Sequence, residues 1–112
     1  MTTLQQTLNE RAATHGFFDV NSRIAQQLKE LIRNQDSYEK LTYAQRESLD
    51  MIMHKVSRIL SGDPKFIDSW RDIAGYAQLV VDELQKDPYA TDVRTEKFPV
   101  QLELPFQGDY YE

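Results

Sequence analysis

The sequence predicts an all-α fold, a bundle of about four helices followed by an extended C-terminal arm. Apolar residues recur at helical spacing in four segments between residues 3 and 85, and polar or glycine-containing breaks separate these segments. After Pro88 the apolar residues alternate with period 2 instead. We therefore expect a helical domain over residues 1–87 and an arm over residues 88–112.

The first two helices are predicted over residues 3–14 and 19–34. Thr3 is suited to the N-cap of the first helix and Gly16 to its C-cap. Phe17 and Phe18 are expected to anchor the turn in the core. The second helix has an apolar stripe made of Val20, Ile24, Leu28, Leu31 and Ile32.

The third and fourth helices are predicted to form an antiparallel hairpin. Thr42 and Gln45 form a capping box, and Gly62 stops the third helix after Ser61. The fourth helix is expected to open at Asp68 or Ser69 and to end near residue 85. The core stripes expected are Leu49, Ile52, Met53, Val56, Ile59 and Leu60 in the third helix, and Trp70, Ile73, Ala74, Ala77, Val80, Val81 and Leu84 in the fourth.

The arm contains the sequence PVQLELPF, in which Val100, Leu102, Leu104 and Phe106 alternate with polar residues or proline. This pattern is typical of an extended segment. A single strand of this length is not stable alone. The arm is expected to lie across the helices, to join a second chain or to stay mobile.

Composition limits the classes of function. At 112 residues the chain suits one domain, and its net charge of -5 disfavours binding to nucleic acids or anionic membranes. The absence of cysteine excludes disulfides, zinc-thiolate sites and thiol nucleophiles. The first residues resemble no signal peptide and no apolar run approaches a membrane span, so we expect a cytoplasmic protein without membrane contact.

The two hairpin helices each have an unusual face opposite the apolar stripe. In the fourth helix this face contains Asp68, Asp72, Gly75, Leu79 and Glu83, with Tyr76 at its flank. In the third helix it contains Glu47, Met51, His54 and Arg58, with Asp50 and Lys55 at its flanks. A glycine inside a helix costs about 0.5–1 kcal/mol relative to alanine, which suggests close approach by another backbone or a ligand at Gly75. These faces are either solvated or form an oligomer interface, a ligand site or both.

Within these faces, Lys55 and Arg58 lie within one turn and could bind a phosphate group. Asp68 and Asp72 are also one turn apart and could share a hard cation such as Mg²⁺. Structural roles compete with both: Asp68 suits an N-cap, and Asp72 could pair with Lys55 or Arg58, either across the hairpin or between subunits. His54 could be solvated or join a ligand set, whereas His15 is expected to cap the first helix.

The run LDMIMHKVSRILSGDPKFIDSWRDIAGYAQLV, with ERAATHGFFDV upstream, resembles a family of small phage and prophage helical proteins of unassigned function. The resemblance covers about residues 8–84 and is fairly specific in Lys55, Arg58, Gly62, Asp63, Pro64, Asp68, Trp70, Asp72, Ala74, Gly75 and Tyr76. More remotely, SWRDIAGYAQLV is similar to the last acidic helix of MazG-type nucleoside triphosphate pyrophosphohydrolases. That similarity implies a Mg²⁺ site made of Glu47, Asp50, Asp68 and Asp72. The chain departs from that family in lacking Glu-Glu-x-x-Glu and in having Ser69 where a glutamate is expected.

Three hypotheses of function follow. The first is a phage-type homo-oligomer that binds a nucleotide-like or phosphorylated small ligand through Lys55, Arg58, Asp72 and Tyr76. Its role would be counter-defence, in which the protein sequesters a signal of the host. The second is a divergent MazG-like enzyme that uses Mg²⁺. The third is an inhibitory module that binds a host protein through its acidic surface and the arm.

Overall fold

The computed structural model describes residues 3–92, and within this range the fold is all-α. Its elements are α1 (Leu4–His15), α2 (Phe18–Arg33), a short 3-10 helix η1 (Asp36–Lys40), α3 (Tyr43–Ser61) and α4 (Ile67–Leu84). The predicted fold class and the α3/α4 hairpin are confirmed. Most of the predicted arm lies outside the described residues. Between residues 3 and 92, no helix is long and apolar enough to cross a membrane.

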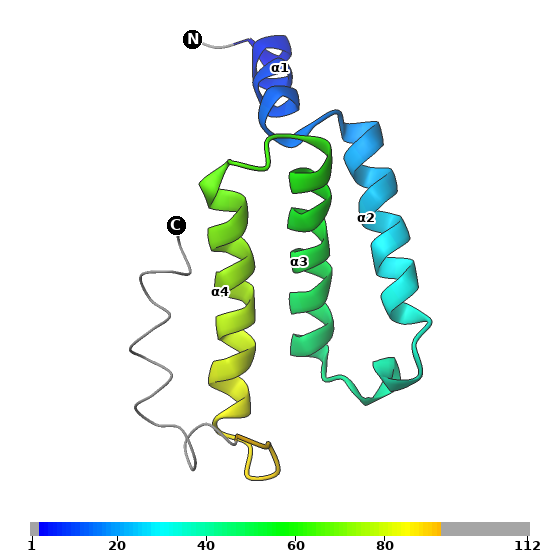
Figure 1. The fold of residues 1–112 in the computed structure, drawn as a ribbon, viewed down its shortest axis with the longest axis vertical. Coiled ribbons are helices and arrows are strands. Elements are labelled where there is room, and N and C mark those ends of the chain that lie inside the picture. Colours follow the sequence, from blue (N-terminus) through cyan, green and yellow to red (C-terminus); the bar gives the residue numbers. More distant parts are fainter. Residues whose placement is uncertain (1–2, 93–112) are drawn as a thin grey trace.

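The three long helices lie side by side in a single layer (Figure 1). Helix α3 occupies the middle, with α2 on one side and α4 on the other, and neighbouring helices run antiparallel. Helix α1 lies at the end of the layer where α3 ends and α4 begins. Because α3 is the shared neighbour, it contributes to both faces of the layer.

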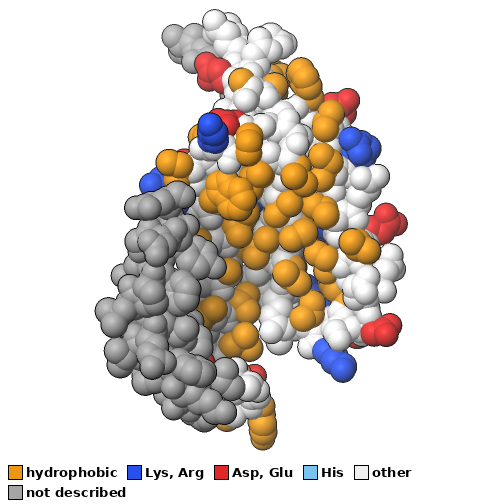
Figure 2. Space-filling view, in the orientation of Figure 1, with side chains coloured by type: hydrophobic (Ala, Val, Ile, Leu, Met, Phe, Trp, Pro, Cys, Tyr) orange, Lys and Arg blue, Asp and Glu red, His pale blue; other side chains and the backbone are white. Residues whose placement is uncertain are grey.

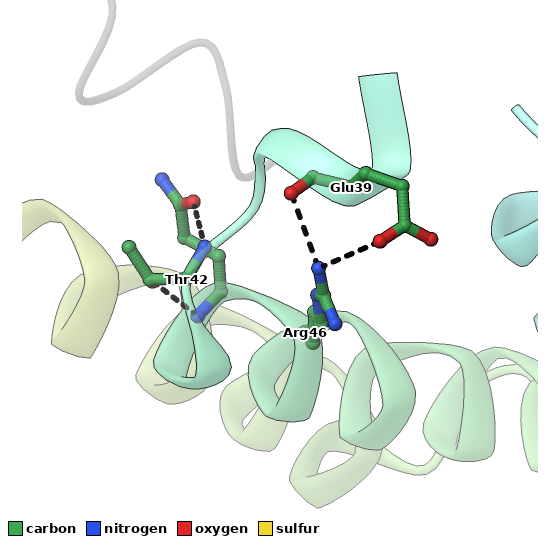
Figure 3. A network of polar contacts seen from close by, with 4 residues as sticks. Glu39, Thr42 and Arg46 are labelled. Atoms are coloured by element: carbon green, nitrogen blue, oxygen red, sulfur yellow. Dashed lines mark hydrogen bonds and ion pairs between the residues drawn. The ribbon is translucent and has the colours of Figure 1, made fainter. Parts of the chain in front are cut away.

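The helix starts follow the predicted caps at Thr3 and Thr42. In each case the threonine hydroxyl accepts a hydrogen bond from the backbone N–H three residues on, and a glutamine side chain accepts one from the threonine N–H. Figure 3 shows the second of these caps beside Arg46, whose guanidinium donates to the Glu39 carbonyl at 3.3 Å. The same group lies 4.7 Å from the centre of the Tyr38 ring. These contacts connect η1 to the first turn of α3, a connection predicted only as a polar loop.

Two glycines bring the end of α1 against the end of α3. Gly16 has a φ of 81°, in the left-handed region that favours glycine, and a Cβ there would collide with the backbone of Ser61. A Cβ on Gly62 would collide with the backbone of Thr14 and His15. The Asp63 N–H donates to the Thr14 carbonyl at 2.8 Å, and the Ser61 hydroxyl donates to the His15 carbonyl at 2.8 Å. The junction therefore depends on both glycines.

Small residues form the contacts between the helices. The buried side chains in the described range are those of Asn21, Ala25, Ser48, Ser57 and Ser69, and Ala25 is the only apolar one among them. Ser57 is fully buried at 0% exposure. Small side chains allow neighbouring helix axes to approach closely, so the helices pack through these residues. The large apolar side chains then project to either side of the contacts.

Several expectations about the core are therefore wrong. Phe17 and Phe18 are 69% and 80% exposed, so they do not anchor the turn between α1 and α2 in a core. Trp70 is 54% exposed, although its indole N–H donates to the Pro64 carbonyl at 2.9 Å. Leu60, in the predicted stripe of α3, is 65% exposed. A single layer has no second layer against which these side chains could be buried.

The start of α4 also differs from the prediction. The helix begins at Ile67 with Phe66 as its N-cap residue, and no side chain caps it. Asp68 lies inside the first turn instead, where a negative charge still favours the positive end of the helix dipole.

Candidate functional site

The polar side of α3 contains Glu47, Met51, His54 and Arg58, which recur at spacings of four, three and four residues. The same spacings recur two residues later along the chain, at Leu49, Met53, Val56 and Leu60. Because two residues correspond to a rotation of about 200° around the helix axis, these four residues lie on the opposite side of the helix. The contacts of α3 with its neighbours lie between these two sides, at Ser48 and Ser57. The layer therefore has one polar face and one apolar face.

Helix α4 has the same division. Ser69 is buried and Ile73 and Val80 are half-buried towards α3, whereas Asp68 and Asp72 lie on the polar side. An ion pair shows how the two polar sides meet, because the Lys55 Nζ atom lies 2.9 Å from the Asp72 Oδ2 atom. The Lys55 side chain is 16% exposed and the Asp72 side chain 47%. The structural role considered for Asp72, an ion pair across the hairpin, is thus present, and two candidate ligand-binding residues bind each other.

A positive region surrounds Arg58 on the polar face. Burial lowers the pKa of His54, and the nearby charges of Arg58, Lys55 and Lys29 lower it further. Burial also lowers the pKa of His15, with further contributions from Arg58, Lys55 and Arg11. Both imidazoles therefore favour the neutral form because cationic groups from α1, α2 and α3 converge there.

Two nitrogen atoms in this region are buried without a hydrogen-bond partner, Nδ1 of His15 and Nε of Arg58. Arg58 has no ion pair with a carboxylate within residues 3–92, whereas Lys55 is paired with Asp72. The His15 ring packs edge-on against the Phe66 ring at 5.5 Å between centroids, which holds it at the junction of α1 and α4. The arrangement leaves two polar nitrogen atoms unpaired within a positively charged region.

The predicted metal ligands are distributed differently. Asp50 pairs with Arg33 of α2 at 3.7 Å, and Asp68 pairs with Arg71 at 3.2 Å. Together with the Lys55–Asp72 pair, three of the four predicted ligands have a basic partner. Within the described part of the chain, no three acidic or histidine side chains gather closely enough to hold a metal ion. The Mg²⁺ site remains a prediction.

Among the remaining candidates on α4, Gly75 and Leu79 lie in open surroundings, whereas Tyr76 does not. A Cβ added to Gly75 would have no neighbouring atom within 4 Å in the described structure, so the close approach expected there does not come from these residues. Leu79 is 60% exposed, and Tyr76 is half-buried beside the polar face.

Sequence reasoning missed that His15 belongs to the same region as Arg58. It treated His15 as a cation at the end of α1, whereas burial and the surrounding positive charges favour the neutral ring. The signal in the sequence was the pair of glycines at Gly16 and Gly62, which bring the ends of two helices together.

Comparisons with known proteins place the chain in a family. A family model described as Domain of unknown function (DUF6378) matches residues 1–84, which include all four α-helices. No curated protein and no solved structure matches the chain.

Proposed function

Because the chain belongs to the DUF6378 family, whose description assigns no activity, we propose from its polar face that it binds a nucleotide-like or phosphorylated small ligand. The observation that carries the proposal is the state of Arg58. Its Nε atom is buried without a hydrogen-bond partner, and it has no carboxylate partner in the described residues. A guanidinium group offers paired N–H donors that match phosphate oxygens.

The surroundings of Arg58 support an anionic ligand. The chain has a net charge of -5, yet Arg58, Lys55 and Lys29 act together on the His54 ring. Positive charge of this kind attracts an anion, although Asp72 offsets the charge of Lys55. His54 and His15 can donate hydrogen bonds in their neutral form, and both gain affinity for a proton when a negative group binds beside them.

The rest of the ligand would lie towards α4. Asp72 orients the Lys55 ammonium group towards α4 through the 2.9 Å ion pair, and the Tyr76 ring lies half-buried on the same helix. A ring and a carboxylate at this position suit the base and the hydroxyl groups of a nucleotide. Gly75 leaves space beside them.

The resemblance to small phage proteins supports a counter-defence role for this binding, in which the protein sequesters a nucleotide signal in the host cytoplasm. Binding of a host protein is the alternative when no phosphorylated compound binds. The remote similarity to MazG-type pyrophosphohydrolases supports a further alternative, Mg²⁺-dependent hydrolysis. For that activity Asp68 and Asp72 would have to leave their basic partners, because both are paired in the structure.

The test is a thermal-shift and calorimetric screen of linear and cyclic nucleotides and of pyrophosphate, with and without Mg²⁺. We expect at least one phosphorylated compound to stabilise the protein without Mg²⁺. The variant Arg58→Gln should weaken that binding about tenfold or more, since a hydrogen bond to a charged group contributes about 1.5–3 kcal/mol.

Arg71→Gln is the matched control for charge. Arg71 is 71% exposed and already pairs with Asp68, so its removal should leave the affinity unchanged. Equal losses in the two variants would indicate only a general effect of charge. Release of pyrophosphate that requires Mg²⁺ and disappears in Asp72→Asn would favour the enzyme instead.

A further inference from the structure

The face of the layer opposite Arg58 is apolar. On α3 it consists of Leu49, Ile52, Met53, Val56 and Leu60, and on α4 of Trp70, Ala74, Ala77, Val81 and Leu84. Helix α2 adds Ile24 and Leu31. We call this surface the apolar face. Figure 2 shows hydrophobic side chains gathered over the middle of the layer, with most charged groups towards its edges.

The apolar face is too exposed to be the inside of a finished core. Leu31 is 62% exposed, Leu60 65% and Trp70 54%, and these residues come from three different helices. Stable domains bury the apolar side of each helix against a second layer. Large contiguous apolar patches on a protein surface mark interaction sites.

The size of the face fits a protein interface. At about 1.5 Å per residue, the 19 residues of α3 extend about 28 Å. Three helices with axes about 8–10 Å apart span about 25 Å with their side chains, so the face covers on the order of 700 Å². Stable interfaces bury about 600–1,000 Å² on each partner, so an area on the order of 700 Å² lies within the range of a stable complex.

We propose that the apolar face packs against the same face of a second copy of this chain, which gives a two-layer dimer with both Arg58 regions on the outside. In a two-fold symmetric dimer the same surface of both subunits forms the interface, so that surface must be self-complementary. The side of α3 that forms the centre of this face, from Leu49 to Leu60, presents only apolar side chains. Two copies can therefore meet there without opposing like charges, despite the net charge of -5 on each.

The other available occupant is the chain's own C-terminal segment, which contains Val100, Leu102, Leu104 and Phe106. An extended segment is about 5 Å wide, the spacing of neighbouring strands, whereas the face is about 25 Å wide. One such segment would cover a strip and leave the rest exposed. A second helical layer matches the face in both dimensions, which is why we assign it to another copy.

This proposal differs from the expectation that oligomers form through the acidic side of α4. It is also independent of the proposed ligand, because the two surfaces lie on opposite sides of the layer. If the protein is not a dimer, the nucleotide screen still tests the proposed ligand. If no ligand binds, the mass measurement still tests the proposed dimer.

The experiment measures the mass of the full chain by sedimentation and light scattering across a dilution series. We expect twice the 13.1 kDa of one chain at micromolar concentration. Trp70 is the only tryptophan, so its fluorescence reports on the apolar face directly. On dilution, the Trp70 emission should shift to longer wavelength as the average molecular mass falls, because dissociation exposes the ring to water.

Two leucine variants provide a matched comparison. Leu60 and Leu79 are 65% and 60% exposed, and they lie on the apolar and polar sides respectively. Leu60→Lys should raise the dissociation constant of the dimer at least tenfold, whereas Leu79→Lys should leave it unchanged. Circular dichroism checks that each variant is helical, and dilution of the unmodified chain tests the proposal even when Leu60→Lys does not fold.

Three results would overturn the proposal: a monomer at micromolar concentration, a dimer that Leu79→Lys dissociates as strongly as Leu60→Lys, or Trp70 emission that does not change with dissociation. The full-length double variant Leu102→Asp/Leu104→Asp tests the other occupant. A monomer whose Trp70 emission shifts in that variant would assign the face to the C-terminal segment.

Discussion

Lys55 of α3 and Asp72 of α4 connect these two helices on the polar face, with 2.9 Å between the ammonium nitrogen and a carboxylate oxygen. Lys55 is mostly buried and Asp72 is about half exposed. The pair therefore has two roles: it contributes to the packing of α3 on α4, and it reduces the positive charge available beside Arg58. A variant that removes only the charge of Asp72 allows the two roles to be measured separately, one as a change in stability and the other as a change in ligand affinity.

Asp72→Asn should lower the free energy of unfolding by about 1 kcal/mol or less, because a partly exposed ion pair contributes little. The same change should tighten binding of pyrophosphate severalfold, since the Lys55 charge is no longer neutralised and pyrophosphate has no base or sugar hydroxyl for the carboxylate to bind. Denaturation and calorimetry measure the two effects. Asp68→Asn is the control, because its pair with Arg71 is exposed and local to α4. Weaker binding of a nucleotide in the same variant would agree with contact between Asp72 and the base or hydroxyl groups, whereas weaker binding of pyrophosphate would contradict the charge effect on Lys55.

The glycines should respond in opposite directions to substitution by alanine. Gly16→Ala and Gly62→Ala should each destabilise the protein by about 2 kcal/mol or more, since a Cβ would collide with the backbone across the junction and Gly16 has a positive φ. Gly75→Ala should stabilise it by about 0.5–1 kcal/mol, because the position is helical and open. Thermal and chemical denaturation of the three variants provides the measurement. A loss of stability in Gly75→Ala would mean that another chain or ligand approaches there after all.

Ser57 should tolerate a smaller side chain and resist a larger one. Its side chain is fully buried, and its hydroxyl donates only within α3, to the His54 carbonyl at 2.6 Å. Ser57→Ala should change the free energy of unfolding by less than about 1 kcal/mol, as is usual for one hydrogen bond. Ser57→Leu should cost about 1–3 kcal/mol by overpacking the helix contact. Similar stabilities for the two variants would show that the helices can separate there without cost.

The helices themselves could be predicted because their ends carry local signals. The capping boxes at Thr3 and Thr42 and the glycine at residue 16 act over a few residues, so their effect does not depend on the rest of the fold. The start of α4 lacks a side-chain cap, and the predicted N-cap, Asp68 or Ser69, lies two or three residues after the actual N-cap residue, Phe66.

The core could not be predicted from periodicity alone. Spacing identifies which side of a helix is apolar, but it does not say whether that side meets another helix of the same chain. Here the helices meet at Ser48, Ser57 and Ser69, and the apolar side is open. The prediction for Trp70 was wrong because it assumed that an apolar position in a helix is a buried one.

The candidate site was predictable in part for a related reason. Lys55, Arg58 and Asp72 share one face because they lie at helical spacing on two helices of a predicted hairpin, and the Lys55–Asp72 pair was among the structural roles considered. His15 and Lys29 come from α1 and α2. Their positions depend on the contact between the ends of α1 and α3 and on the order of the helices in the layer, and helical spacing predicts neither.

Acid should destabilise the protein through His15 and His54. The ordinary pKa of histidine is 6.5, and both pKa values are lowered in the folded chain, by burial first and then by Arg58 and Lys55. As the pH falls below 6.5, the unfolded chain binds protons at these rings before the folded chain does, so the free energy of unfolding decreases until the lowered pKa values are reached. Well above pH 6.5 the two states bind equally few protons and the effect is absent.

The measurement is urea denaturation at several pH values between 7.5 and 5, with the unmodified chain compared with His15→Gln and His54→Gln. Glutamine does not titrate, so each variant should show a smaller loss of stability in this interval. The charges that face the two rings come from Arg11 on α1, Lys29 on α2, and Lys55 and Arg58 on α3. Arg58→Gln should therefore reduce the acid sensitivity as well, since Arg58 is the charge that lowers both pKa values most. An unchanged pH dependence in all three variants would show that other groups cause the acid response.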